Sequence, residues 1–154
     1  MPQASTGEGT GRLGLGPIDQ VAYVVEDMAR ALPHYEALFG AFEVGESELT
    51  ACDYRGREVS CRLKLAVNRA GPVEVELIEV LAGEAPHSEH LRDHGEGLHH
   101  VRFRVADLEA KLERLEKEGC ETIFFKRFSP DIAFAYLETS AALGHSVIEL
   151  LEMP

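Results

Sequence analysis

The amino-acid sequence predicts an α+β protein built from two tandem halves, each with the element order βαβββ. In each half, a short β-branched apolar run typical of a strand precedes one helical segment and three further strand-like segments. Residues 20–28 (QVAYVVEDM) also align without a gap with residues 100–108 (HVRFRVADL). The ends of the halves match as well, at 75–79 (VELIE) and 148–152 (IELLE). We infer a duplicated module.

The first module covers about residues 16–82. An apolar, β-branched strand is expected over 18–25. Asp27 can cap a helix over 28–39, in which Pro33 predicts either a kink or a later start. Three strands should follow, near 41–49, 58–67 and 73–80.

The second module covers about residues 95–152 and repeats this order. A strand is expected over 97–105, and Asp107 can cap the helix that follows it. Three strands should complete the module, near 121–127, 132–138 and 146–151. Residues 1–15 are rich in Gly, Ser and Thr, which predicts a flexible N-terminal tail before a single domain at 16–154.

Composition narrows the class of partner. The 154 residues carry 15 Lys and Arg against 27 Asp and Glu, a net charge of −12. Because nucleic acids and anionic membranes require a basic face, we expect neither as a partner. No secretory signal or membrane span is evident. Three cysteines without Cys-x-x-Cys spacing indicate reduced thiols, so a cytoplasmic protein is expected.

Strand alternation predicts which side chains converge. On the first strand of each module, Gln20 and His100 occupy equivalent positions on the open face. His99 then belongs to the opposite, helix-covered face and is interpreted as a partly buried structural residue. Glu76 and Glu149 each lie between two aliphatic residues and therefore point away from the core. Pairing of the modules about a pseudo-twofold axis would bring the four polar residues together.

One amide oxygen, one imidazole and two carboxylates suit a hard or borderline divalent ion, namely Co, Mn, Ni, Zn or Mg. Taken singly, Glu76 or Glu149 is interpreted as a solvated strand residue, but their paired placement in a repeat favours metal binding. Either carboxylate is a candidate for proton transfer. Arg102 shares the face of His100, where it could bind an anionic group of a substrate or form a salt bridge to a neighbouring strand.

Three further histidines, His87, His90 and His94, follow the spacing of one face of a short helix. We interpret them as part of a surface helix in preference to a second metal site.

The sequence resembles the vicinal oxygen chelate superfamily over nearly all of 16–152. Four segments resemble its methylmalonyl-CoA epimerase branch: IDQVAYVVEDMARALPHYEALFG, VEVELIEV, GEGLHHVRFRVADLEAKLERLEKEG and HSVIELLE. The resemblance implies paired βαβββ modules that form a cupped, partly open mixed sheet around one metal ion. It also implies that ligands come from the first and last strand of each module, that His100 is one of them, and that the protein is a homodimer.

Two positions depart from the epimerase pattern, which has His at 20 and Gln at 76. The set Gln20, Glu76, His100 and Glu149 resembles instead that of some glyoxalase I enzymes. Those enzymes hold glutathione with an Arg and an Asn, and residues 21–25 and 77–81 contain neither. The epimerase also uses a non-ligand glutamate for proton transfer. Glu58 lies near that position, although Val59 falls there in an ungapped count, and a solvent-exposed Glu58 is the alternative.

The resemblance implies a metal-dependent isomerase or epimerase that acts through a metal-stabilised enolate on a small molecule, either an acyl-CoA or a similar carboxylated substrate. The first alternative is a lyase of the glyoxalase I type. The second alternative, from a different class, is a metal-free antibiotic-binding protein on the same fold.

Overall fold

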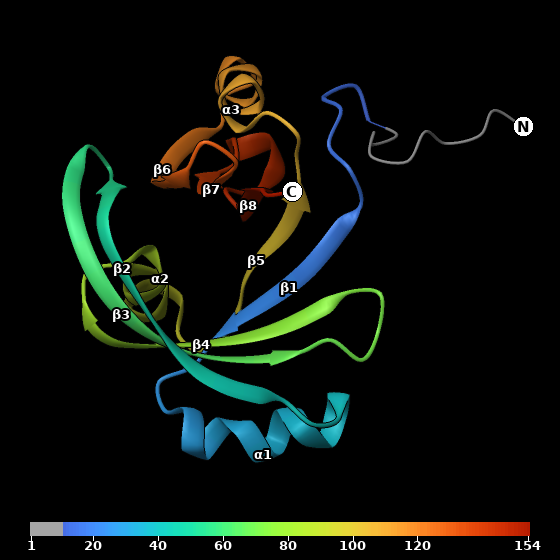
Figure 1. Ribbon diagram of the computed structural model, residues 1–154, viewed down its shortest axis with the longest axis vertical. Coiled ribbons are helices and arrows are strands. Elements are labelled where there is room, and N and C mark those ends of the chain that lie inside the picture. The colour runs from blue at the N-terminus through green and yellow to red at the C-terminus, as the bar shows by residue number, and fades with distance from the viewer. Residues whose placement is uncertain (1–10) are drawn as a thin grey trace, which may run out of the picture.

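A computed structural model describes residues 11–154 (Figure 1). Residues 1–10, most of the predicted tail, lie outside the described residues. No helix among the described residues is both long and apolar enough to cross a membrane. The elements follow one another as β1 (Ile18–Val24), α1 (Met28–Phe39), β2 (Glu43–Tyr54), β3 (Arg57–Asn68), β4 (Glu74–Gly83), α2 (Pro86–His94), β5 (Gly97–Arg104), α3 (Leu108–Lys117), β6 (Glu121–Ser129), β7 (Ile132–Glu138), a 3₁₀ turn (Ala141–Leu143) and β8 (Val147–Glu152).

The strands form one mixed sheet, closed in the order β1-β4-β3-β2-β6-β7-β8-β5. In each half the first strand pairs in parallel with the last, and the remaining neighbours are antiparallel. The halves meet at two antiparallel seams, β1 with β5 and β2 with β6. The resemblance implied a partly open sheet, which is wrong here. Strand β2 continues to Tyr54, past its expected end near 49, and there it pairs with Phe124 of β6.

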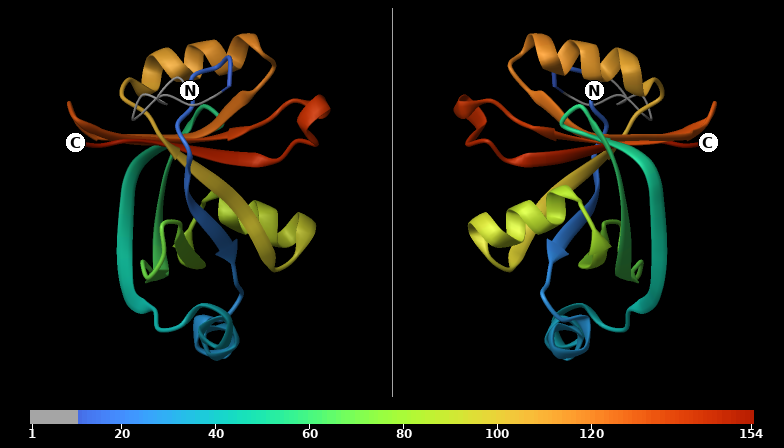
Figure 2. Two further views of the ribbon diagram at one scale, coloured as in Figure 1. Left: turned by 90° about the vertical axis from the view of Figure 1, so that its right-hand side faces the viewer. Right: turned by 90° about the vertical axis from the view of Figure 1, so that its left-hand side faces the viewer.

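Helices α1 and α3 cover opposite outer sides of the barrel (Figures 1 and 2). Both begin at the predicted caps, where Asp27 accepts a hydrogen bond from the Arg30 amide and Asp107 accepts one from the Ala110 amide. Pro33 lies within α1, which nevertheless starts at Met28. Each helix buries an apolar face against the outside of the sheet, and a third cluster fills the inside of the barrel.

The interior cluster is built by side chains that alternate inward along the strands. Its members include fully buried Phe124 and Ala22 and the thiols of Cys52 and Cys61. Cys52, Cys61 and Cys120 are all free and buried.

The segment immediately before β1 packs on the fold. Leu13 and Leu15 contact the apolar cluster under α3, and Arg12 Nη1 lies 2.6 Å from Glu118 Oε1. Residues 11–15 were expected to belong to the flexible tail, but their apolar side chains are partly buried against the second half.

A glycine at the end of β4 provides a test of the close contact between β3 and β4. Gly83 has φ +83°, and a Cβ there would lie 2.1 Å from the Ser60 carbonyl oxygen of β3. We expect Gly83→Ala to lower the free energy of unfolding by about 2 kcal/mol or more, because strain and a backbone clash add. Urea denaturation measures the change.

Gly56 provides the matched control, because it has φ +84° and nothing within 4 Å of the added Cβ. It follows Arg55 in the β2–β3 hairpin turn, where both residues have positive φ. Gly56→Ala should cost only about 1 kcal/mol of backbone strain. Equal losses in the two variants would contradict the close contact between β3 and β4.

Candidate functional site

Four adjacent strands, in the order β4-β1-β5-β8, carry the predicted ligand residues. Their registers bring the side chains to two neighbouring levels of the barrel, because Glu76 and His100 both pair with Ala22, two residues beyond Gln20 on β1. On β1, Gln20 lies beside Glu74 of β4 and opposite Arg102 of β5, and Arg102 lies beside Glu149 of β8. The predicted ligands occupy one strand each: Gln20 on β1, Glu76 on β4, His100 on β5 and Glu149 on β8.

Three of these residues are in direct contact. His100 Nε2 lies 3.2 Å from Gln20 Oε1 and 2.9 Å from Glu149 Oε2. The Gln20 amide nitrogen donates to Glu74 Oε1 at 2.7 Å, which turns the amide oxygen toward His100. Two ligand atoms at right angles around an ion, each about 2.1 Å from it, are about 3.0 Å apart. The observed separations therefore fit donors to a single ion.

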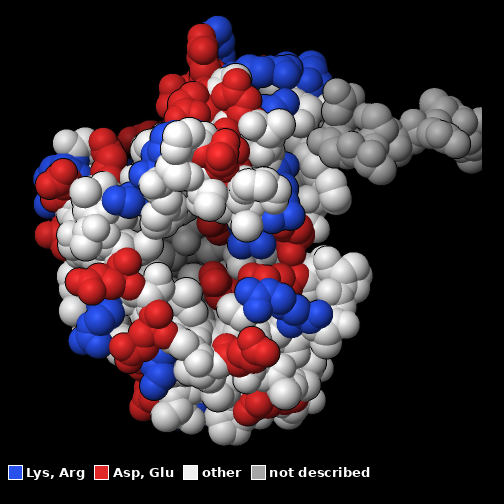
Figure 3. Space-filling view, viewed as in Figure 1, with Lys and Arg blue, Asp and Glu red and all other residues white. Residues whose placement is uncertain are grey.

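The fourth predicted ligand, Glu76, lies on the same cavity. Glu76, Gln20 and Glu149 line a cavity of about 120 Å³ inside the barrel. The remaining lining is mainly apolar and comes from both halves: Ser47, Leu49, Leu63, Leu65, Ile78, Arg102, Phe134 and Tyr136. The space-filling view shows a hollow at the centre of the molecule, with acidic and basic side chains beside it (Figure 3).

Burial dominates the electrostatics of this group. It raises the pKa of Glu149 to about 8, against the opposing effect of Arg102. Burial, together with the charges of Glu149 and Glu74, raises the pKa of Glu76 to about 8. Burial and the charge of Arg102 lower the pKa of His100 to about 3, so its imidazole is neutral at neutral pH. A neutral imidazole beside two desolvated carboxyl groups is a donor set that a divalent cation would stabilise.

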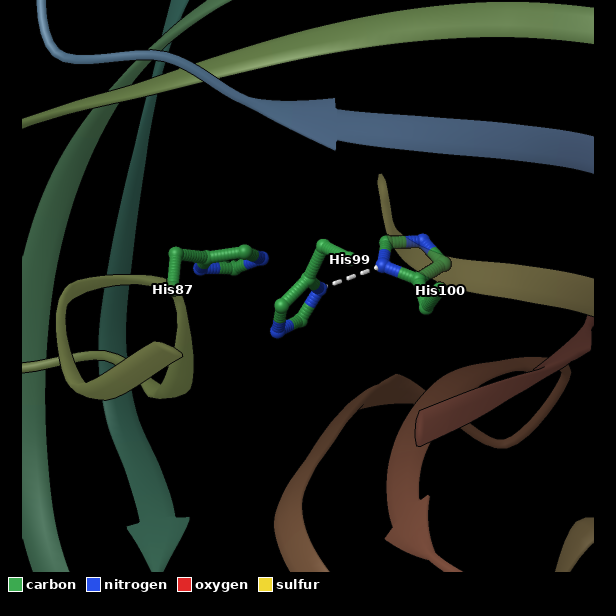
Figure 4. A group of neighbouring side chains, drawn as sticks. All are labelled: His87, His99 and His100. Carbon is green, nitrogen blue, oxygen red and sulfur yellow. Dashed lines mark hydrogen bonds between the residues drawn. The ribbon is translucent and has the colours of Figure 1, made fainter. Parts of the chain in front are cut away.

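A bulge in β5 changes the orientation of His99. Ala22 of β1 pairs with His100 and Tyr23 pairs with Leu98, so His99 is the extra residue. The expectation that His99 and His100 face opposite sides is therefore wrong. Both rings are buried, and His99 Nδ1 lies 2.7 Å from His100 Nδ1 (Figure 4). Alternation along a strand predicts which face a side chain takes only where the strand pairing is regular.

A second irregularity in the same seam positions an acid beside Arg102. Ile18 pairs with Phe103 and Gln20 with Arg102, which leaves Asp19 unpaired. Arg102 Nε donates to Asp19 Oδ1 at 2.9 Å, and its Nη2 donates to Asp19 Oδ2 at 3.3 Å. Arg102 thus forms the salt bridge to a neighbouring strand that was one of its two expected roles, and it also lines the cavity.

Sequence reasoning missed three residues of the site. Glu74 stands two positions before Glu76, so alternation along β4 could have found it. Asp19 lies at the irregularity in β1, where alternation gives no signal. Tyr136 has a buried ring whose centroid lies 4.8 Å from that of His100, and nothing local to its strand marks it.

The structure does not bring Glu58 to this group. Glu58 is exposed on β3, opposite Asp53 of β2, whereas its neighbour Val59 packs in the barrel interior. An ungapped alignment with the epimerase pattern places Val59, not Glu58, at the position of the proton-transfer glutamate. The structure agrees with that alignment, because Val59 is the residue that points into the barrel.

Comparisons with known proteins give a family match and structural neighbours. A family model described as "Glyoxalase/Bleomycin resistance protein/Dioxygenase superfamily" matches residues 19–136. A comparison with curated proteins found no match. Among solved structures, a hypothetical protein from Bacillus halodurans C-125 is 20% identical with a TM-score of 0.65, covering 90% of this chain and 94% of that one.

Methylmalonyl-CoA epimerases also occur among the structural neighbours. The Mycobacterium tuberculosis enzyme is 20% identical with a TM-score of 0.61, covering 91% of this chain and 89% of that one. A variant of the Streptomyces coelicolor enzyme, in complex with 2-nitronate-propionyl-CoA, is 21% identical with a TM-score of 0.62. It covers 92% of this chain and 100% of that one. At these identities the likeness shows a shared fold.

The raised carboxyl pKa values predict how the metal-free protein responds to pH. A glutamate with an ordinary pKa of 4.5 and a folded pKa of about 8 stabilises the fold at low pH, and this contribution is lost as the pH rises toward 8. The stability of Glu149→Gln relative to the wild type should therefore increase from about pH 5 to about pH 8. Urea denaturation with a chelator present measures this difference.

Glu48→Gln changes an exposed carboxylate on β2 and serves as the control. Its unfolding free energy should run parallel to that of the wild type across the same range. If the difference in unfolding free energy between Glu149→Gln and the wild type stays constant with pH, the raised pKa of Glu149 is contradicted.

Proposed function

Because the chain belongs to the Glyoxalase/Bleomycin resistance protein/Dioxygenase superfamily, we propose that it is a divalent-metal-dependent isomerase acting on a carboxylated acyl thioester. It would move the proton α to the thioester carbonyl, as an epimerase of the methylmalonyl-CoA type does. The observation that carries the proposal is the convergence of an amide and two carboxylates, with Arg102, on one cavity, where the His100 imidazole contacts Gln20 and Glu149.

Gln20, Glu76, His100 and Glu149 would hold the ion. Their oxygen-rich set with one nitrogen suits Co, Mn, Ni, Zn or Mg. The ion would supply Lewis-acid stabilisation of the negative charge that develops on a substrate oxygen, an effect worth several kcal/mol. Two carboxylates would balance the charge of a divalent cation, which makes the buried group electrostatically neutral.

Proton transfer, substrate binding and exclusion of water would each fall to different side chains. Glu149 is held against His100, whereas within residues 11–154 no hydrogen bond ties Glu76 to another side chain. Glu76 is therefore the carboxylate freer to accept the α proton. Inversion at that carbon needs a proton delivered to the opposite face, and Glu149, the other carboxyl group on the cavity, would supply it. Arg102 would face the anionic group of the substrate. The apolar lining, which includes Leu63 and Phe134, would exclude water from the reacting centre.

The size of the cavity indicates that it would enclose only the reacting end of the substrate. At about 120 Å³ it is well below the roughly 300–1,000 Å³ of sites that enclose a whole drug-sized ligand. The acyl group would occupy the cavity, and a long thioester tail such as that of CoA would extend outside. One structural neighbour, an epimerase variant, is in complex with an acyl-CoA analogue, 2-nitronate-propionyl-CoA.

A lyase of the glyoxalase I type is the second candidate, favoured by the donor set of Gln20, Glu76, His100 and Glu149. Residues 21–25 and 77–81 contain no Arg or Asn, the residues with which glyoxalase I enzymes hold glutathione, and this opposes the lyase.

The homodimer implied by the resemblance stays a prediction.

Metal binding is the first test. We expect the purified protein to bind one divalent ion at the oxygen-rich site, as measured by elemental analysis and by titration with Mn²⁺. Glu149→Gln and His100→Gln should each weaken Mn²⁺ binding by more than about tenfold, because each removes a proposed ligand. Glu48→Gln should bind Mn²⁺ as the wild type does. A folded protein without divalent-ion binding would point to the metal-free binding class instead.

Proton exchange is the second test. In D₂O the metal-loaded protein should exchange the α proton of a carboxylated acyl-CoA, such as methylmalonyl-CoA, as followed by NMR. Glu76→Gln should slow this exchange by about 10²–10⁴-fold, the usual contribution of a general base. Turnover of the methylglyoxal–glutathione hemithioacetal alone would assign the lyase. If a metal-loaded protein acts on neither substrate, the isomerase proposal fails.

A further inference from the structure

A cluster of histidines lies where α2 meets the start of β5. The sequence interpretation placed His87, His90 and His94 on a surface helix, but His87 is buried, with 1% of its surface exposed. It meets His99 and His100, which are 4% and 1% exposed. One ring nitrogen from each of these three lies within 4.8 Å of those of the other two. Figure 4 shows the His87 ring directed toward the other two.

The hydrogen bonds of this cluster leave two ring nitrogens unused. His99 Nδ1 lies 2.7 Å from His100 Nδ1, and His87 Nε2 lies 3.0 Å from the Tyr136 hydroxyl. His87 Nδ1 and His99 Nε2 are buried and have no hydrogen-bond partner among residues 11–154. Buried polar atoms nearly always have a partner, so the unused His87 Nδ1 points to a ligand. His99 Nε2 lies across its ring from the Nδ1 atom that contacts His100, so Nδ1 is the atom that His99 would offer to the same ligand.

We propose that His87, His99 and His100 form a second metal site, which is rich in nitrogen and takes a borderline transition-metal ion such as Cu²⁺, Ni²⁺ or Zn²⁺. Imidazole nitrogens favour these ions over Mg²⁺ or Mn²⁺. Nitrogens bound to one ion at about 2.1 Å lie up to about 4 Å apart, so small rotations of the rings suffice. Tyr136 would fix the orientation of the His87 ring, as outer partners of metal-binding histidines do.

The nitrogen-rich site and the oxygen-rich site share one ring. His100 Nε2 faces Gln20 and Glu149, and His100 Nδ1 faces His99. Each ring nitrogen therefore serves a different donor set. Because the sets differ in hardness, hard ions would select the oxygen-rich side and borderline ions the histidine side. This inference does not depend on the proposed isomerase reaction.

A separate cavity reaches two of the three proposed ligands, His99 and His100. It measures about 510 Å³ and is lined by His90, His94, His99 and His100, with the carboxylates of Glu89 and Asp93 among its walls. The smaller cavity at Gln20 and Glu149 is a distinct space, and His100 lines only the larger one.

Electron paramagnetic resonance of the wild-type protein with one equivalent of Cu²⁺ tests the site without any substitution. Coordination by three imidazoles is expected, seen as coupling to three nitrogens. Binding at the oxygen-rich site would show coupling to the single nitrogen of His100. A one-nitrogen spectrum would overturn the proposal.

Substitutions provide the second measurement. His87→Gln should weaken Cu²⁺ and Ni²⁺ binding by more than tenfold and leave Mn²⁺ binding unchanged, whereas Glu149→Gln should do the reverse. His34→Gln, at an exposed position of α1, is the control and should change neither. Circular dichroism confirms folding, and if His87→Gln does not fold, the wild-type spectrum decides.

The two proposals fail separately. If Cu²⁺ is coordinated by three nitrogens but Mn²⁺ does not bind, the nitrogen-rich site is supported and the metal dependence in the proposed function is contradicted. Mn²⁺ binding with one-nitrogen Cu²⁺ coordination would do the opposite. Loss of Cu²⁺ binding in Glu149→Gln but not in His87→Gln would also overturn the nitrogen-rich site.

Discussion

The antiparallel seam between β1 and β5 is the constraint on which the rest of the structure depends. Each of these strands begins one half of the chain, and each pairs in parallel with the last strand of its own half. Joining them produces the run β4-β1-β5-β8, so polar residues from sequence positions as distant as Gln20 and Glu149 lie at one level. Without this seam, each half would present two polar side chains to water and neither would enclose a cavity.

The same seam contains the two irregularities that shape the chemistry. An extra residue in β1 brings Asp19 against Arg102, and an extra residue in β5 brings His99 beside His100. Bulges near functional sites commonly redirect side chains in this way. Here they hold Arg102 near the carboxylates of Glu76 and Glu149 and place a second imidazole, that of His99, behind His100. The group is costly to bury as bare charges, which is why the pKa values of both carboxyl groups are raised to about 8.

Much of the fold was predictable because its signals are local. Apolar alternation, the caps at Asp27 and Asp107 and the matching segments of the two halves all follow from residues close together in the chain. The candidate site was predictable to the extent that it repeats, since Gln20 and His100 occupy equivalent positions of two regular strands. Glu58 was placed by an approximate count and is exposed, because the strand register puts Val59 inside.

By itself, the sequence determined the strands, the helices and which face each side chain takes along a regular strand, because backbone geometry imposes those periods within a few residues. Only the tertiary structure decided the closure of the sheet, the inward turn of His99 and the salt bridge of Arg102. Each depends on how two distant strands pair, and a register shift of one residue reverses the face of a side chain. The histidine cluster belongs to this second class, since α2 and β5 meet only in the folded chain.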